Sequence, residues 1–147
     1  MEEKDYKEDI NALDEIHKGA CMGVDAISFV LDKVEDDSLK AELEKEEKDY
    51  NAIKKDIEEI YPKYNEGEPH KTGPMTKAMT WSGIEMKTMA DKSNSKIAEL
   101  LLQGVNMGII EGRRILNEKK INKEVNDLVS RYVTMQEKSV ETLKKYL

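Results

Sequence analysis

The fold is decided by the stretch from residue 6 to residue 34, which reads YKEDINALDEIHKGACMGVDAISFVLDKV. Its mostly apolar side chains recur at alternating intervals of four and three residues: Tyr6, Ile10, Leu13, His17, Ala20, Val24, Ile27, Leu31 and Val34. Because an α-helix has about 3.6 residues per turn, this spacing places them in one stripe on one face. The stretch therefore predicts a long amphipathic helix, over residues 5–35, that packs in a helical bundle.

The same alternation returns after residue 38 and predicts a second helix over 38–62. Its stripe has a single charged member and reads Leu39, Leu43, Glu46, Tyr50, Ile53, Ile57, Ile60 and Tyr64. Asp37 or Ser38 can cap the start of this helix, since a short polar side chain there accepts a bond from a free backbone N–H. The link between the two helices is only a few residues long, so we expect antiparallel neighbours.

The second half of the chain follows a loop at 62–74 that contains the three prolines, at 62, 69 and 74. A shorter helix is expected at 75–91, where four methionines and Trp81 lie. Residues 91–95 then offer a cap for a helix over 94–117, although one kinked helix over 75–116 stays open. The last helix is expected at 121–146. The sequence thus predicts one all-α domain, 1–147, an antiparallel four-helix bundle made of hairpins 5–62 and 94–146.

Composition excludes several classes of protein. The net charge is −7 and no cluster of basic residues stands alone, which argues against a nucleic-acid partner. No apolar run approaches the roughly 18 residues of a membrane span, and no secretory signal is seen, so we expect a cytoplasmic protein. Cys21 is the single cysteine and cannot form an internal disulfide. No catalytic triad, phosphate-binding loop or cysteine with a reachable histidine is recognised, which favours a non-catalytic protein and leaves an enzyme as the alternative.

Two hairpins of long helices joined by a long connection resemble the ferritin-like superfamily. The segments KGACMGVDAI (18–27), DKSNSKIAEL (91–100) and NMGII (106–110) also resemble uncharacterised proteins of clostridia-like anaerobic bacteria. The second resemblance implies no known activity. The first implies a bundle that, in its di-iron members, carries a Glu on two helices and Glu-x-x-His on the other two.

This chain departs from the di-iron pattern, because it has only two histidines. His70 lies in the loop, and His17 follows Asp14 in a lone Asp-x-x-His, so we expect no di-iron centre and no cofactor. His17 is instead expected to be a half-buried core residue.

An alternative site without histidine remains open. Glu46 lies on the seam of the second helix, where it either reaches solvent or is paired; the nearest candidates on the first helix are Asp25 and Ser28. Asp25, Glu46 and Glu111 together would form a degenerate carboxylate site for iron or another divalent cation.

Glycines inside the predicted helices carry a stronger argument. Residues 19–31 and 104–116 share a weak repeat, and five glycines fall within these segments: Gly19, Gly23, Gly104, Gly108 and Gly112. Each mid-helix glycine costs about 0.8–1 kcal/mol relative to alanine, so the missing side chains should have a use. We expect a close helix contact at which Gly19 and Gly23 face Gly104 and Gly108, with Met22 and Met107 alongside. The alternative is room for a large group such as Trp81, or for a ligand.

Two classes of function follow. The first is a non-catalytic helical module that binds a protein partner or assembles with itself into an oligomer. The second is a divergent ferritin-like protein that binds metal or takes part in redox chemistry.

Overall fold

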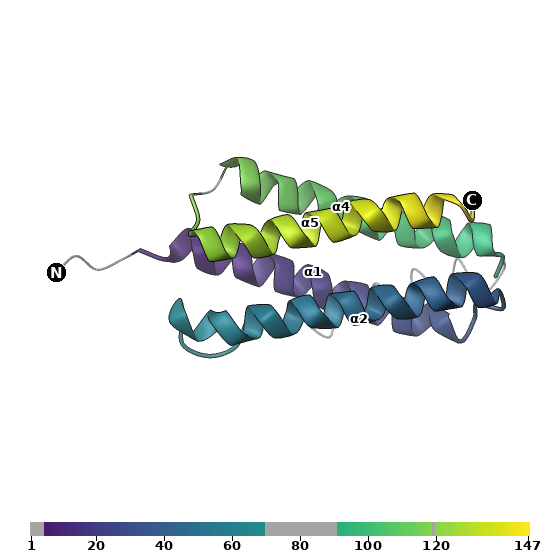
Figure 1. Ribbon diagram of the computed structural model, residues 1–147, viewed down its shortest axis with the longest axis horizontal. Coiled ribbons are helices and arrows are strands. Elements are labelled where there is room, and N and C mark those ends of the chain that lie inside the picture. Colours follow the sequence, from purple (N-terminus) through teal and green to yellow (C-terminus); the bar gives the residue numbers. More distant parts are fainter. Residues whose placement is uncertain (1–4, 70–90, 119) are drawn as a thin grey trace.

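The computed structural model describes residues 5–69, 91–118 and 120–147, and this part of the chain is helical with no β-strand. Its long helices are α1 (Lys7–Leu31), α2 (Asp37–Ile60), α4 (Asn94–Glu118) and α5 (Lys123–Lys144), and a short 3₁₀ helix, η1 (Tyr61–Lys63), follows α2. Figure 1 shows the four long helices running side by side along one axis. The predicted all-α bundle of long helices is confirmed.

The helices pair as two hairpins that pack on one another. α1 contacts α2 and α4 contacts α5, while α1 also contacts α4 and α5, and α2 contacts α5. In Figure 1 the hairpin of α4 and α5 lies above that of α1 and α2. Each helix is therefore enclosed on one face and open on the other.

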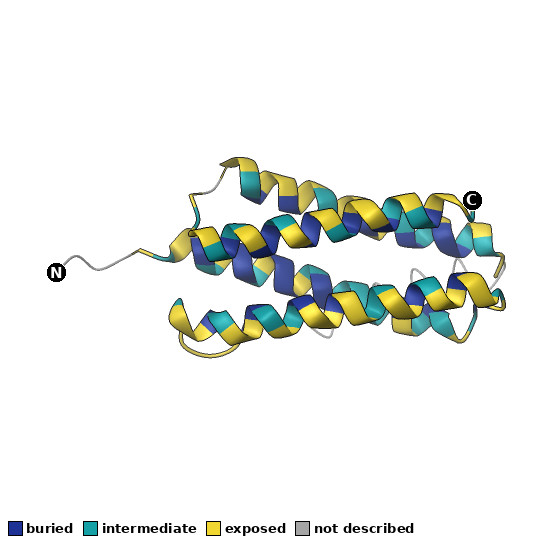
Figure 2. Ribbon diagram, viewed as in Figure 1, coloured by how far each residue is buried: buried dark blue, intermediate teal, exposed yellow. Residues whose placement is uncertain are grey.

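The predicted stripes form the core. Figure 2 shows buried residues lining the inward faces of the helices, while their outward faces are exposed. All four helices supply side chains that are at most 3% exposed, among them Leu13, Ile16, Leu43, Ile53, Ile57, Ile97, Ile115, Val125 and Val129. Burial of apolar surface contributes about 25 cal/mol per Å² and is the main force that holds such a bundle together.

The helix ends refine the boundaries expected from the sequence. Asp36 caps α2, because its Oδ1 accepts a bond from the backbone N–H of Leu39 at 2.9 Å. The prediction of Asp37 or Ser38 as the cap was therefore wrong by one or two residues. The start of α4 is capped within the predicted segment, where Ser93 Oγ accepts from the backbone N–H of Lys96 at 3.2 Å.

The connection between the hairpins is only partly described. Residues 91–93 are not helical, so α4 begins as a helix of its own rather than as the continuation of one kinked helix. Apart from Asp91, the shorter helix expected at 75–91 lies outside the described residues, and so do Trp81 and His70. The loop expected from residue 62 begins inside η1.

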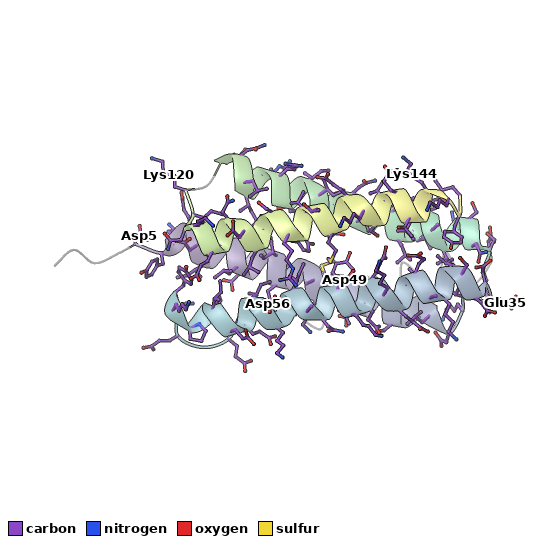
Figure 3. The ribbon with its side chains drawn as sticks, in the orientation of Figure 1. Asp5, Glu35, Asp49, Asp56, Lys120 and Lys144 are labelled. Carbon is purple, nitrogen blue, oxygen red and sulfur yellow. The ribbon has the colours of Figure 1, made fainter. Side chains whose placement is uncertain are left out.

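Charged side chains cover the outside of the bundle, as the labelled Asp49, Asp56 and Lys144 illustrate in Figure 3. Arg131 pairs with Asp56 across α5 and α2, and the two side chains are 46% and 41% exposed. Exposed pairs of this kind contribute about 0–1 kcal/mol each, so they add little to the apolar core. None of the described helices is both long enough and apolar enough to span a membrane.

Candidate functional site

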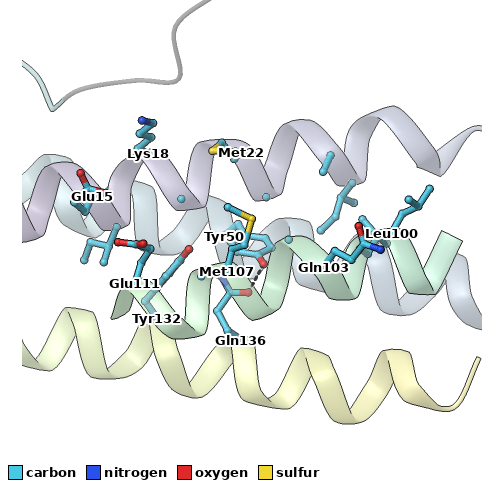
Figure 4. Close-up of a pocket in the computed structure, with 18 of the residues that line it drawn as sticks. Glu15, Lys18, Met22, Tyr50, Leu100, Gln103, Met107, Glu111, Tyr132 and Gln136 are labelled. Carbon is cyan, nitrogen blue, oxygen red and sulfur yellow. Dashed lines mark hydrogen bonds between the residues drawn. The ribbon is translucent and has the colours of Figure 1, made fainter. Parts of the chain in front are cut away.

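A cavity of about 520 Å³ opens between α1 and α4 (Figure 4). Ligand pockets for small molecules commonly measure about 300–1,000 Å³. Residues from all four long helices line it: Glu15, Ile16, Lys18, Gly19, Met22, Gly23, Ala26 and Ile27 of α1, Tyr50 of α2, Leu100, Leu101, Gln103, Gly104, Met107, Gly108, Glu111 and Ile115 of α4, and Tyr132 and Gln136 of α5. The walls are thus mostly apolar, and seven of the nineteen residues in this list carry polar or charged side chains.

Glycines on both walls leave the space from which the cavity is made. Gly19 and Gly23 of α1, and Gly104 and Gly108 of α4, all line it. At Gly104, a Cβ atom added to the backbone would have no other atom within 4 Å. A side chain at this position would extend into the opening.

The closest neighbours of the glycines are side chains from the other two helices. A Cβ on Gly23 would lie 2.6 Å from Cζ of Tyr50, and one on Gly19 would meet the Tyr132 hydroxyl. The glycines that were expected to meet across a helix crossing therefore face each other across a cavity, with tyrosine side chains nearest to them.

Gly108 and Gly112 of α4 lie against side chains of α5. A Cβ on Gly108 would meet the side-chain amide of Gln136, and one on Gly112 would meet Cγ2 of Val133. Gly112 is buried and does not line the cavity, so its missing side chain serves the packing of α4 against α5.

The inner end of the cavity is polar. Tyr50 Oη donates a hydrogen bond of 2.7 Å to Oε1 of Gln136, and these residues are only 4% and 2% exposed. Tyr132, 3% exposed, lies beside them. A buried amide without hydrogen bonds is costly, so the bond from Tyr50 stabilises Gln136 inside the bundle.

Tyr50 and Tyr132 both have raised pKa values in this setting. Burial raises the pKa of Tyr132 to about 12, against a smaller lowering by its hydrogen bond with Gln136, while the charge of Glu111 adds to the rise. Burial likewise raises the pKa of Tyr50 far above its ordinary value. At neutral pH the site therefore presents hydroxyl groups and not phenolates.

The mouth of the cavity carries charges. Glu15, Lys18 and Glu111 are exposed there, and Arg114 pairs with Glu111 at 3.5 Å. Met107 is 64% exposed at the same edge, which is unusual for a large apolar side chain. Its thioether can adapt to apolar groups of different shape.

The structure does not assemble the three candidate carboxylates into a metal site. Burial raises the pKa of the half-buried Glu46, and Glu42 and Asp49 raise it further, while the Ser139 hydroxyl acts in the opposite direction. Glu111 lies at the mouth of the cavity, which neither Glu46 nor Asp25 lines. Among the residues described, no group of three or more His, Cys, Asp or Glu side chains is placed to share a metal ion. Of the two expected neighbours of Glu46, Ser28 instead donates to Glu47 at 2.6 Å.

A second polar cluster surrounds His17 and corrects two expectations. His17 is fully buried rather than half-buried; its Nε2 lies 2.9 Å from Oε1 of Glu58, and its Nδ1 lies 3.7 Å from Sγ of Cys21. The view that no cysteine has a reachable histidine was therefore wrong. Cys21 is itself only 7% exposed, and neither residue lines the cavity.

Gln136 is the site residue that the sequence analysis missed. It lies four residues after Tyr132 and three before Ser139 on α5, within a stripe that is otherwise mainly apolar. A polar residue on an apolar stripe is the signal that singles out Glu46, and Gln136 carries the same signal. Tyr50 is part of the predicted stripe of the second helix, where it is expected only as a core residue.

No known protein family, no curated protein and no solved structure matches this chain. The cavity and the residues around it are therefore the features that point to a function.

Proposed function

We propose that this protein is a non-catalytic binding module that holds a small, largely apolar molecule in the cavity between α1 and α4. The observation that carries the proposal is a cavity of about 520 Å³ with mostly apolar walls and a polar inner end. This combination, in which a few fixed polar groups orient a ligand inside an apolar pocket, is typical of small-molecule sites.

The glycine at 104 supports binding over packing. Gly19, Gly23 and Gly108 have side chains of neighbouring helices close to where a Cβ would stand, so packing accounts for them. Gly104 has no such neighbour, although alanine there would improve the helix by about 0.8–1 kcal/mol. An opening that a ligand enters accounts for a glycine that the packing of the bundle does not require.

The relatives of this protein, its location in the cell and its self-association are further parts of this proposal. The four-helix fold is compatible with a divergent ferritin-like bundle. The relation of this protein to proteins of clostridia-like bacteria and its location in the cytoplasm stay predictions. Self-association also stays a prediction; it is supported by two exposed apolar side chains on α4, Met107 and Ile110, which are 64% and 51% exposed.

Binding of Nile red, a neutral dye whose fluorescence rises in apolar surroundings, tests the proposed site. The full chain should bind the dye saturably, and Gly104→Leu should abolish binding while the protein stays folded by circular dichroism. Leucine has room at this position, since an added Cβ meets nothing within 4 Å, and its side chain would occupy the cavity.

Asn106→Leu is the matched control, because Asn106 is an exposed residue of α4 that does not line the cavity. It should bind the dye as the natural protein does. The proposal fails if the natural protein does not bind, if Gly104→Leu binds normally, or if both leucine variants lose binding equally.

A further inference from the structure

The polar end of the cavity has a fixed direction of hydrogen bonding. Tyr50 Oη donates its proton to Oε1 of Gln136 at 2.7 Å, so the oxygen of this amide must face Tyr50. The Nε2 group of Gln136 then faces the other way, toward Gly108 of α4. A Cβ on Gly108 would meet both this nitrogen and the hydroxyl of Tyr132, so the two groups lie close together. An amide nitrogen can only donate, so the Tyr132 oxygen that lies beside it can serve only as an acceptor toward Gln136.

With this orientation of the Gln136 amide, the proton of the Tyr132 hydroxyl is available to a molecule in the cavity. A tyrosine hydroxyl can accept from one group and donate to another. Within residues 5–69, 91–118 and 120–147, no acceptor takes the Tyr132 proton, although the side chain is only 3% exposed and lines the cavity. The hydroxyl lies on the cavity wall, so an acceptor atom of a bound molecule would gain one hydrogen bond from it.

The charges around this hydroxyl disfavour an anionic acceptor. Glu111 lies close enough for its negative charge to act on Tyr132, and Glu15 adds a second carboxylate at the mouth. Among the described residues that line the cavity, Lys18 alone is cationic, and Arg114, which pairs with Glu111 at 3.5 Å, is not part of the lining. A carboxylate or phosphate at the hydroxyl would be repelled by Glu111, whereas a neutral oxygen would not.

We infer that the ligand is a neutral molecule with an apolar body and one acceptor oxygen (a carbonyl, ether or hydroxyl) that receives the proton of Tyr132. This inference rests on the proposed function and adds the chemical class of ligand to it. The apolar body would lie between Met22 and Met107, whose side chains flank the cavity on α1 and α4 (Figure 4).

Four probes of equal chain length test the class of ligand: octan-2-one, octanoate, octylamine and octane. Each is titrated against the Nile red complex of the full chain, and its dissociation constant is obtained from displacement of the dye. Octan-2-one should bind about tenfold more tightly than octane, which matches the gain from one hydrogen bond, and octanoate should bind more weakly than the ketone.

Tyr132→Phe deletes only the hydroxyl and keeps the ring. It should weaken the binding of octan-2-one about tenfold and leave that of octane unchanged. Tyr146→Phe is the control, because Tyr146 lies beyond the end of α5 and does not line the cavity. Its binding of all four probes should match that of the natural protein.

The outcomes separate the two proposals. If Nile red and all four probes fail to bind, the proposed function is overturned. If the dye binds but octane, octanoate or octylamine binds as tightly as octan-2-one, the class of ligand is overturned and the binding site stands. The inference also fails if Tyr132→Phe binds the ketone with unchanged affinity.

Discussion

At the scale of single residues, the glycines of α1 and α4 differ in what surrounds them. A Cβ at Gly23 would lie 2.6–2.8 Å from three ring atoms of Tyr50, a side chain that is buried and held by its bond to Gln136. Gly23→Ala should therefore overpack this contact and destabilise the protein by about 1–3 kcal/mol. Gly104→Ala should stabilise it by up to about 1 kcal/mol, because nothing opposes the added methyl group. Urea unfolding of both variants measures the difference, and a stabilised Gly23→Ala would refute the packing described here.

Glu46 gives a second prediction at this scale. Burial raises its pKa above the ordinary value of 4.5, so the folded state prefers the protonated form. The stability linked to this group is fully present below pH 4.5 and is lost as the pH rises through the raised pKa. Glu46→Gln, which is always neutral, should thus be more stable than the natural protein at neutral pH, and the gain should shrink in acid.

Urea midpoints measured across this pH range check the Glu46 prediction. Glu44→Gln serves as its control, since Glu44 is an exposed residue of the same helix. A gain that does not depend on pH, or an equal gain in the Glu44 variant, would show that burial of the Glu46 charge is not the cause.

At the scale of elements, the start of α2 depends on one side chain. Asp36 accepts the bond from Leu39 N–H, whereas Asp37, the first residue of the helix, lies in its first turn. Loss of a capping side chain costs about 0.5–2 kcal/mol, so Asp36→Ala should lower the free energy of unfolding by that amount. Asp37→Ala should cost less, because it removes only a charge near the helix dipole. Thermal unfolding of the two variants compares them, and an equal or reversed order would contradict the assigned cap.

At the scale of the whole molecule, tyrosines link the helices and make the bundle sensitive to alkali. Burial raises the pKa of Tyr132 on α5 and of Tyr64 after η1 to about 12 each, aided at Tyr64 by its bond to Glu124. A raised folded-state pKa means that stability is present below the unfolded value of 10 and is lost as the pH rises toward 12. The free energy of unfolding should therefore fall over this interval.

Tyr132→Phe tests the alkaline transition. It removes one of these groups, so its stability should fall less steeply between pH 10 and about 12 than that of the natural protein. Equilibrium urea unfolding at each pH provides the slopes. Identical slopes in the two proteins would mean that ionisation of Tyr132 is not coupled to unfolding.

The sequence by itself determined the helices, because the period of an apolar stripe is a local property of the chain. The alternation from Tyr6 to Val34 was sufficient to predict α1, and α2, α4 and α5 begin and end within a few residues of their expected bounds. The cap of α2 was misplaced because three consecutive residues, Asp36, Asp37 and Ser38, all carry side chains that can cap. The backbone conformation selects among them.

Only the tertiary structure decided the site, because its contacts join residues that are far apart in the chain. Tyr50 and Gln136 are separated by 86 positions, and His17 and Glu58 by 41, so no local pattern connects them. The glycines were visible in the sequence, and their cost indicated that they had a use. Whether a missing side chain admits a neighbouring helix or leaves a cavity depends on how α1 and α4 are held apart, and the buried tyrosines from α2 and α5 lie nearest to those glycines.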